Sequence, residues 1–281
     1  MSKEKGKNET RLRNRVWEID ALRGILILSV LFYHLYMTVD AFCIDGIYRI
    51  DPVKYVRLTD PLNFWFSVGS TGEVLPAAFP KFAMKHMQPL WVDMFFVVSG
   101  ISCMFSRNNL KSGLRLVCGA AFVSVFTKLL VLYTGKESQF IRFGVLHCYA
   151  ACHLIYYYFL ERSNKWVLLS VAGASLLIGY YLKFNPVDSG FALLFPFGIR
   201  EEGVITRDYW PVFPMLGWFL LGVVLGKRFY PEKKTIFPEQ SGKKWHRPLC
   251  YLGRYSGLIY CGHMVVYTLL FCGIGYIFKL Y

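Results

Sequence analysis

Long apolar segments, each close to the length that a helix needs to cross a bilayer, dominate this sequence of 281 residues. A helix spans a hydrocarbon core of about 30 Å with roughly 20 mostly apolar residues. Seven segments come close to this requirement, at 20–41, 89–106, 115–135, 141–160, 166–183, 209–226 and 251–278. The sequence therefore predicts an all-α, polytopic membrane helix bundle with about seven transmembrane helices.

The basic residues follow the alternation of these segments. Lys and Arg number 32 against 18 Asp and Glu, a formal net charge of +14. Cytoplasmic loops collect Lys and Arg. The segments 1–19, 107–114, 161–165 and 227–250 carry 17 Lys and Arg residues. The four segments on the other side carry nine, although their total length is greater. We therefore expect a cytoplasmic N-terminus, with 1–19 as a basic tail and 20–281 as the transmembrane domain. This alternation excludes nucleic acid as the reason for the charge.

Two connections on the outer side, 42–88 and 184–208, are apolar yet broken by Pro and Gly. They are too apolar for free loops and do not suit a span. Re-entrant backbone is tolerated only against protein or a water-filled cavity. We expect interfacial or re-entrant segments that cover the outer side of the bundle.

Ionisable residues inside spans are costly and indicate functional sites. The first span holds Asp20, Arg23 and His34. At 3.6 residues per turn, the 11 residues between Arg23 and His34 place both on one face, about 16 Å apart. Asp20 is close enough to pair with Arg23. Gly24 would allow another backbone or a ligand to approach closely.

Other titratable residues lie in or beside the later spans. Asp93, His147 and Asp208 fall at middle to outer depth, and His263 lies near the middle of the last span. Asp93, His147 and Asp208 could converge with His34 on one pocket. His147 and His153 are six residues apart and face different ways, so no metal site is expected on that helix.

Several segments resemble known transmembrane acyltransferases. Arg23 and His34 fit the Arg-x10-His spacing of the acyltransferase-3 family, and WVDMFFVVSG resembles a segment of that family. The segments IRFGVLHCYAACHLIYY, RDYWPVFPMLGWFLLGVVLGK and LGRYSGLIYCGHMVVY resemble, in order, motifs of bacterial members of the heparan-alpha-glucosaminide N-acetyltransferase catalytic-domain family.

The resemblance implies a multi-pass enzyme of the bacterial cell membrane. Such an enzyme takes an acetyl or other short acyl group from cytoplasmic acetyl-CoA or another acyl-CoA. It delivers the group to a hydroxyl or amine of a sugar or cell-surface glycan. In the acyltransferase-3 family the Arg and His of the motif are implicated in catalysis, and this role carries over to Arg23 and His34.

The residues suggest a mechanism of acyl transfer. Histidine serves as a general base near neutral pH, and we expect His34 in this role, with His147 and Asp208 orienting the acceptor or tuning His34. Arginine suits phosphate. Basic residues at the cytoplasmic mouth would hold the CoA phosphates, and other acidic or titratable residues would line the pocket. The residues expected at the CoA phosphates are Arg23, Arg107, Lys111 and Arg254. The residues expected to line the pocket are Asp20, Asp93 and His263. No metal is expected.

Two other functions stay open on the sequence. A proton-coupled transporter or flippase could use intramembrane His and Asp as a relay, although the chain shows no internal repeat of the kind that such folds use. A non-catalytic membrane scaffold is the second alternative. For acyl transfer, a direct route and a two-step route through acyl-histidine are both open. The identity of the acceptor and the choice between oxygen and nitrogen are open as well.

Overall fold

The computed structural model describes residues 16–43, 53, 66–68, 74–76, 87–204, 206 and 208–278. The basic tail expected at 1–19 falls almost entirely outside these residues. So does most of the outer segment expected at 42–88.

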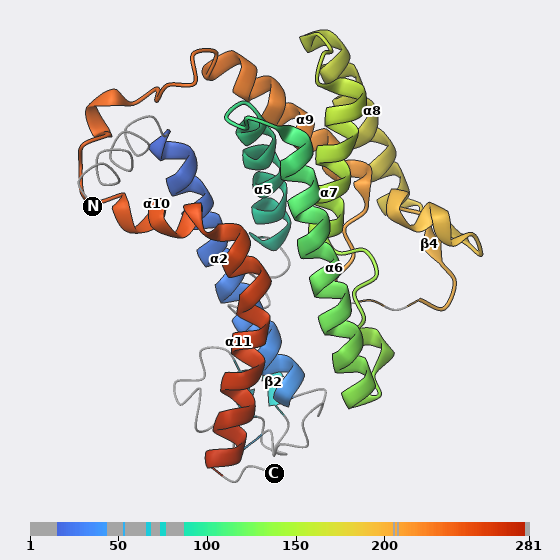
Figure 1. Cartoon of the computed structure of the whole chain (residues 1–281). Helices are drawn as coiled ribbons and strands as arrows, with labels where there is room; N and C mark the ends of the chain where they lie inside the picture. Colours follow the sequence, from blue (N-terminus) through green and yellow to red (C-terminus); the bar gives the residue numbers. More distant parts are fainter. Residues whose placement is uncertain are drawn as a thin grey trace. The chain divides into compact units, whose positions relative to one another are not determined.

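Helices dominate the described chain (Figure 1). Five of them are long and apolar enough to cross a membrane, and two shorter apolar helices, Gln88–Cys103 and Val145–Leu160, coincide with the other two predicted spans. An all-α polytopic bundle is therefore confirmed, and the number of seven spans and the side of the N-terminus stay predictions. The helices are α2 (Trp17–Cys43), α5 (Gln88–Cys103), α6 (Asn109–Thr134), α7 (Val145–Ile155) with a π-helical continuation (Tyr156–Leu160), α8 (Lys165–Phe184), α9 (Val212–Phe229), α10 (Arg247–Arg254) and α11 (Ser256–Ile277).

Helix ends differ from the predicted spans where local capping decides them. Helix α6 begins at Asn109, six residues early, because the Asn108 side chain accepts a hydrogen bond from the Lys111 amide. The helix stops at Gly135, which adopts a left-handed conformation with φ of 71°. Apolar periodicity does not report such caps, so it places helix ends poorly.

The predicted last span, 251–278, is two helices. Helix α10 ends at Arg254 and α11 begins at Ser256, with Tyr255 between them. Helix α10 also starts four residues earlier than the predicted span, within the basic connection. The end of α10 carries Arg254, which pairs with Asp20.

The chain forms two compact units. The first comprises 1–24 and 93–254, and the second comprises 25–92 and 255–281. In the first, α9 packs against α8, and α6 packs against α7. Glycines allow close contact between α5 and α9: Gly100 faces the Phe219 carbonyl and Gly222 faces the Val97 carbonyl.

In the second unit, the C-terminal part of α2 packs against α11. The Tyr267 hydroxyl of α11 donates a hydrogen bond to the Leu31 carbonyl of α2 at 3.1 Å. The strands β1 (Phe66–Val68) and β2 (Val74–Pro76) form a small antiparallel pair. The helix pair is the part of this unit that carries titratable residues of interest.

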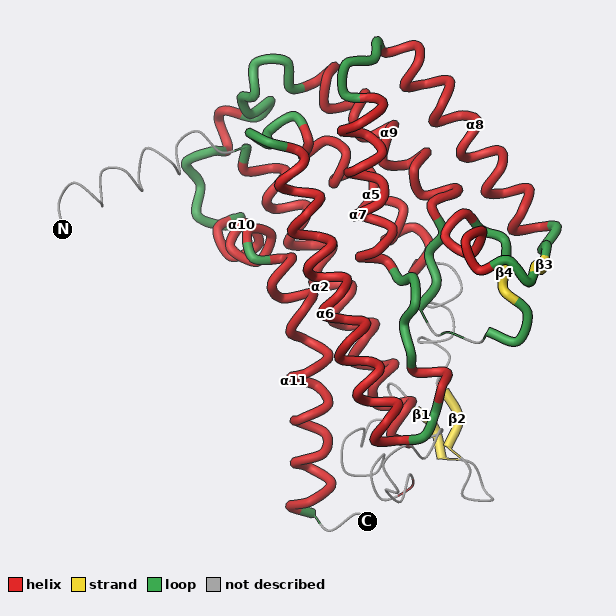
Figure 2. The backbone as a smooth tube through the Cα atoms, turned by 45° about the vertical axis from the view of Figure 1, so that its right-hand side comes forward, coloured by secondary structure: helices red, strands yellow, loops and turns green. Residues whose placement is uncertain are grey.

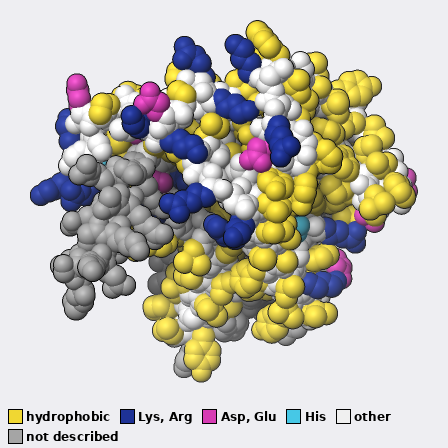
Figure 3. Space-filling model, turned by 45° about the horizontal axis from the view of Figure 1, so that its top comes forward, with side chains coloured by type: hydrophobic (Ala, Val, Ile, Leu, Met, Phe, Trp, Pro, Cys, Tyr) yellow, Lys and Arg dark blue, Asp and Glu magenta, His cyan; other side chains and the backbone are white. Residues whose placement is uncertain are grey.

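Apolar side chains cover the outside of the helices. Leu129 and Leu132 of α6 are 59% and 73% exposed, and Leu177 of α8 is 75% exposed. Hydrophobic side chains fill much of the face drawn in Figure 3, with several Lys and Arg side chains gathered toward its upper part. Exposed apolar helix faces of this extent match a lipid environment.

The outer segment 184–208 does not span. It folds as β3 (Asp188–Ser189), a 3-10 helix η4 (Ala192–Phe197) and β4 (Arg200–Glu201), with β3 and β4 paired in parallel (Figure 2). Phe195 is buried, and its carbonyl accepts a hydrogen bond from the Tyr209 hydroxyl at 2.6 Å. The place of 184–208 at the membrane interface, as an interfacial or re-entrant segment, stays a prediction.

Candidate functional site

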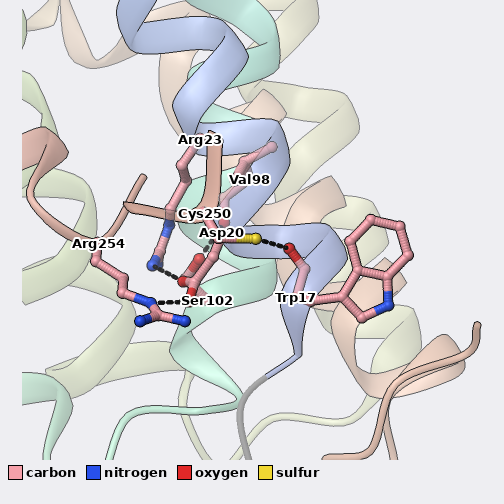
Figure 4. Close-up of polar contacts among 7 residues, drawn as sticks. All are labelled: Trp17, Asp20, Arg23, Val98, Ser102, Cys250 and Arg254. Atoms are coloured by element: carbon pink, nitrogen blue, oxygen red, sulfur yellow. Dashed lines mark hydrogen bonds and ion pairs between the residues drawn. The ribbon is translucent and has the colours of Figure 1, made fainter. Parts of the chain in front are cut away.

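A buried carboxylate lies between two arginines in the first unit (Figure 4). Asp20 of α2 lies 3.7 Å from Arg23, one helical turn away, through Oδ1 and Nη1. Its other oxygen, Oδ2, lies 3.3 Å from Nε of Arg254 at the end of α10. The Asp20 side chain is 10% exposed, and the arginine side chains are 32% and 29% exposed. Asp20 thus pairs with both arginines, one through each carboxylate oxygen.

Close contact of two backbones positions this cluster. A side chain at Gly24 would overlap the Leu249 carbonyl, and one at Gly253 would overlap the Asp20 carbonyl. The Cys250 thiol also donates to the Trp17 carbonyl at 3.3 Å. The close approach predicted for Gly24 is confirmed, and the backbone that approaches is α10. This contact brings Arg254 to Asp20 across 234 residues of sequence.

A pair of histidines lies between α2 and α11 in the second unit. Nδ1 of His34 and Nε2 of His263 are 2.7 Å apart, and the ring planes are nearly parallel, with an interplanar angle of 17°. Nδ1 of His263 lies 2.6 Å from the Tyr260 carbonyl. His263 is buried and His34 is partly buried. The structure therefore brings two of the predicted residues into direct contact.

The carbonyl of Tyr260 fixes the direction of these hydrogen bonds. A carbonyl oxygen only accepts, so Nδ1 of His263 carries the proton and donates. In neutral His263, Nε2 is then an acceptor, and Nδ1 of His34 must donate to it. Neutral His34 therefore has its lone pair on Nε2, where no described residue forms a hydrogen bond. This is the protonation pattern of a general base.

His147 and Asp208 both lie at the start of α7 in the first unit. Nδ1 of His147 accepts from the Gly144 amide at 3.2 Å, and Nε2 lies 3.0 Å from the Ser124 hydroxyl. Ser124 donates to the Ile141 carbonyl at 2.9 Å, so Nε2 of His147 donates to Ser124. Both ring nitrogens are thus engaged. His147 and Asp208 thus bind adjacent backbone amides at one helix end, and their convergence with His34 and Asp93 stays a prediction.

Asp208 holds the same helix end. Its Oδ2 accepts from the Val145 amide at 3.2 Å, at a helix N-terminus that favours negative charge. Burial raises the pKa of Asp208 to about 6, while the bonds from Val145 and the Trp210 side chain oppose this rise. Gly144 has no room for a side chain because Asp208 occupies the space. The helix therefore starts at Val145 and not at 141.

A third histidine cluster lies between α5 and α7. Nε2 of His153 is 3.0 Å from the Ser99 hydroxyl, and Nδ1 is 3.6 Å from the Cys103 thiol. His153 is buried, and the Arg23 charge acts on it. We predicted no role for His153. Its one signal is the four-residue spacing of Ser99 and Cys103, which places both on one helix face.

The remaining predicted residues lie apart from these clusters. Arg107 and Lys111 are exposed at the start of α6, and no described residue pairs with their side chains. Asp93 is partly buried in α5, where the Lys183 charge acts on it. No hydrogen bond or ion pair among the described residues joins Asp93 to His147 or Asp208. The structure thus gathers Asp20, Arg23 and Arg254 at one place and His147 with Asp208 at another.

The described part of the chain holds no group of three or more His, Cys, Asp and Glu side chains that could bind a metal ion.

Comparison with known proteins identifies the family. No curated protein and no solved structure gave a match to the chain. The family model described as "Heparan-alpha-glucosaminide N-acetyltransferase, catalytic" matches residues 62–265, which is well over half of the chain. The match includes α5 to α10 and the His263 end of the histidine pair. Membership implies transferase activity, and together with the apolar helices it indicates an integral membrane enzyme. The chain therefore belongs to the heparan-alpha-glucosaminide N-acetyltransferase catalytic-domain family.

Proposed function

We propose that this protein transfers an acetyl group from cytoplasmic acetyl-CoA to an amine or hydroxyl of a sugar or cell-surface glycan. The observation that carries the proposal is His34, whose Nδ1 is bonded to His263 and whose Nε2 keeps its lone pair. Family membership supports an acetyl donor and a sugar acceptor. The protein would work as a multi-pass protein of a bacterial cell membrane.

The chemistry needs one base and no redox partner. Nε2 of His34 takes the proton of the acceptor amine or hydroxyl as its nitrogen or oxygen attacks the thioester carbonyl. The bond from that carbonyl to the CoA sulfur breaks, and the departing sulfur takes the proton back from His34. The products are the acetylated sugar and CoA with a free thiol, and His34 is again neutral.

Arg23 and Arg254 would bind the phosphates of CoA. Both arginine side chains are about one-third exposed, which leaves them accessible to an anion. Guanidinium groups form paired hydrogen bonds with phosphate oxygens. Arg107 and Lys111 are exposed at the start of α6 and would add to this attraction. Asp20 would hold both arginines in place before CoA arrives.

His147 and Asp208 would act on the acceptor through the position of α7. Their hydrogen bonds to Gly144, Val145 and Ser124 leave no free lone pair on the His147 ring for a base. Asp93 would line the pocket that receives the acceptor. We therefore keep these residues in positioning roles and assign the proton transfer to His34.

Acetyl-CoA consumption with glucosamine as the probe acceptor tests the base. Purified His34→Ala should lose at least about 100-fold in kcat, the usual contribution of a general base. Tyr267→Phe is the matched control, because it removes a hydrogen bond between the same two helices and keeps the ring that contacts His263. It should retain activity within a few-fold. Wild-type turnover in His34→Ala would rule out the assignment.

Thermal stabilisation by CoA tests the donor site. Stabilisation by a bound ligand grows with its concentration relative to Kd. Arg23→Gln and Arg254→Gln should each weaken the stabilisation. Arg142→Gln is the control, because Arg142 pairs with Glu201 at 3.1 Å in a loop far along the chain from this cluster. Equal stabilisation of all three variants and the wild type would remove the cluster from the donor site.

A further inference from the structure

We propose that His263 is a positioning residue that selects the tautomer of His34, with the Tyr260 carbonyl as the fixed end of the chain of hydrogen bonds. This inference rests on the proposed role of His34 as the base. It adds the reason why the base has its lone pair on Nε2 and not on Nδ1.

The order of the three groups carries the argument. Tyr260 lies three residues before His263 on α11, so its carbonyl and Nδ1 of His263 belong to one helical turn. The acceptor at the end of the chain is therefore set by local backbone geometry. Every proton position before it then follows, up to Nε2 of His34. If His263 were absent, Nδ1 of His34 would lose its acceptor and either tautomer could form.

The His34–His263 pair is close and enclosed by aromatic rings. The ring centroids of His34 and His263 are 4.8 Å apart, and the 2.7 Å contact is a short hydrogen bond. Tyrosine rings surround it: Tyr33 and Tyr260 contact His34, and Tyr260 and Tyr267 contact His263. These tyrosines are the titratable side chains that face the pair from described residues of α2 and α11.

A neutral partner suits this location. A carboxylate in place of His263 would form an ion pair with His34 during the reaction, but it would carry an uncompensated charge inside the bilayer at other times. Neutral His263 offers the same acceptor with no such cost. As His34 takes a proton at Nε2, its Nδ1–H bond to His263 strengthens because the donor becomes charged.

Two replacements of His263 test the inference, one that keeps a hydrogen-bond acceptor for Nδ1 of His34 and one that removes it. His263→Gln places an amide oxygen near the position of Nε2 and should keep kcat within about tenfold of the wild type. His263→Phe keeps a flat ring but has no acceptor. His263→Phe loses both the preference for one tautomer and the hydrogen bond to the charged imidazole. Its kcat should fall by more than tenfold, up to the roughly 100-fold that general-base catalysis contributes. The KM for acetyl-CoA should change less than about threefold. A merely structural defect would instead change KM together with kcat.

The pH profile of kcat/KM gives the second readout. Loss of the acceptor changes the proton affinity of His34, so the profile of His263→Phe should shift, while that of His263→Gln stays closer to the wild type. Wild-type kcat and an unshifted profile in His263→Phe would overturn the inference. If His34→Ala is inactive at the same time, the proposed function survives. Activity in His34→Ala would instead contradict the proposed function itself.

The intact protein offers a test that needs no folded variant at His263. Nitrogen NMR of protein labelled with ¹⁵N-histidine distinguishes a protonated from an unprotonated ring nitrogen. The His34 signals are assigned by their loss in His34→Ala. We expect a protonated Nδ1 and an unprotonated Nε2 for His34. A proton on Nε2 of neutral His34 would overturn the inference whatever the kinetics show.

Discussion

Replacement of Asp20 by Asn should destabilise the protein more than the loss of an ordinary ion pair. The change keeps the size of the side chain and removes the charge that two arginines share. Nη1 of Arg23 and Nε of Arg254 lie 3.7 Å and 3.3 Å from the carboxylate oxygens. The variant therefore leaves two positive side chains close together with no opposite charge from this position.

The magnitude follows from these distances. At an effective dielectric constant of about 20, each contact corresponds to about 5 kcal/mol of Coulomb energy. Both arginines are about one-third exposed, so water screens the interaction and replaces part of it. Asn also retains a hydrogen-bond acceptor. We expect a net loss of about 2–3 kcal/mol, toward the lower end of the cost of breaking a buried pair.

Thermal unfolding in detergent measures this loss. For a chain of this size 1 kcal/mol corresponds to about 2–4 °C, so Tm of Asp20→Asn should fall by about 4–12 °C. Glu137→Gln is the matched control. It removes one carboxylate of an exposed pair with Lys128 at 3.5 Å, and such pairs contribute about 1 kcal/mol or less. A Tm of Asp20→Asn equal to that of this control would refute the reasoning.

Three further outcomes follow from single contacts. Asp208→Asn should raise Tm at pH 8 and have little effect below pH 4. The reason is that the pKa of Asp208 lies near 6 in the fold, so stability falls as pH rises from 4 through 6, by up to about 3 kcal/mol at 1.4 kcal/mol per pH unit. A Tm difference that does not change between pH 4 and pH 8 would contradict this. Gly24→Ala should lower Tm by a few degrees, since a methyl group meets the Leu249 carbonyl and overpacking costs about 1–3 kcal/mol; Gly173→Ala, where nothing lies within 4 Å, is the control. Asn108→Ala should destabilise α6 by about 1 kcal/mol through loss of its N-cap, measured by denaturant or thermal unfolding, and an unchanged midpoint would argue against the cap.

The sequence predicted most of the helices because membrane burial leaves a strong signal. A run of apolar residues of the right length is sufficient to identify α6, α8 and α9, since the signal adds over some 20 positions. It could not place the start of α7, where one carboxylate from a later loop caps the helix. Nor did it show the break at Tyr255. Helix α10 is amphipathic and ends at Arg254, whereas α11 is mostly apolar, and the predicted span 251–278 joined parts of both.

Within the site, the sequence by itself determined what one helix turn decides. The pairing of Asp20 with Arg23 and the close approach at Gly24 are consequences of helical spacing and of a missing side chain, and both were predicted. Only the tertiary structure brought Arg254 to Asp20 and His263 to His34, and only it showed that Ser99, Cys103 and His153 form a cluster. These partners lie between 50 and 234 residues apart. Helical periodicity fixes which residues share a face, but the packing of one helix on another decides which faces meet.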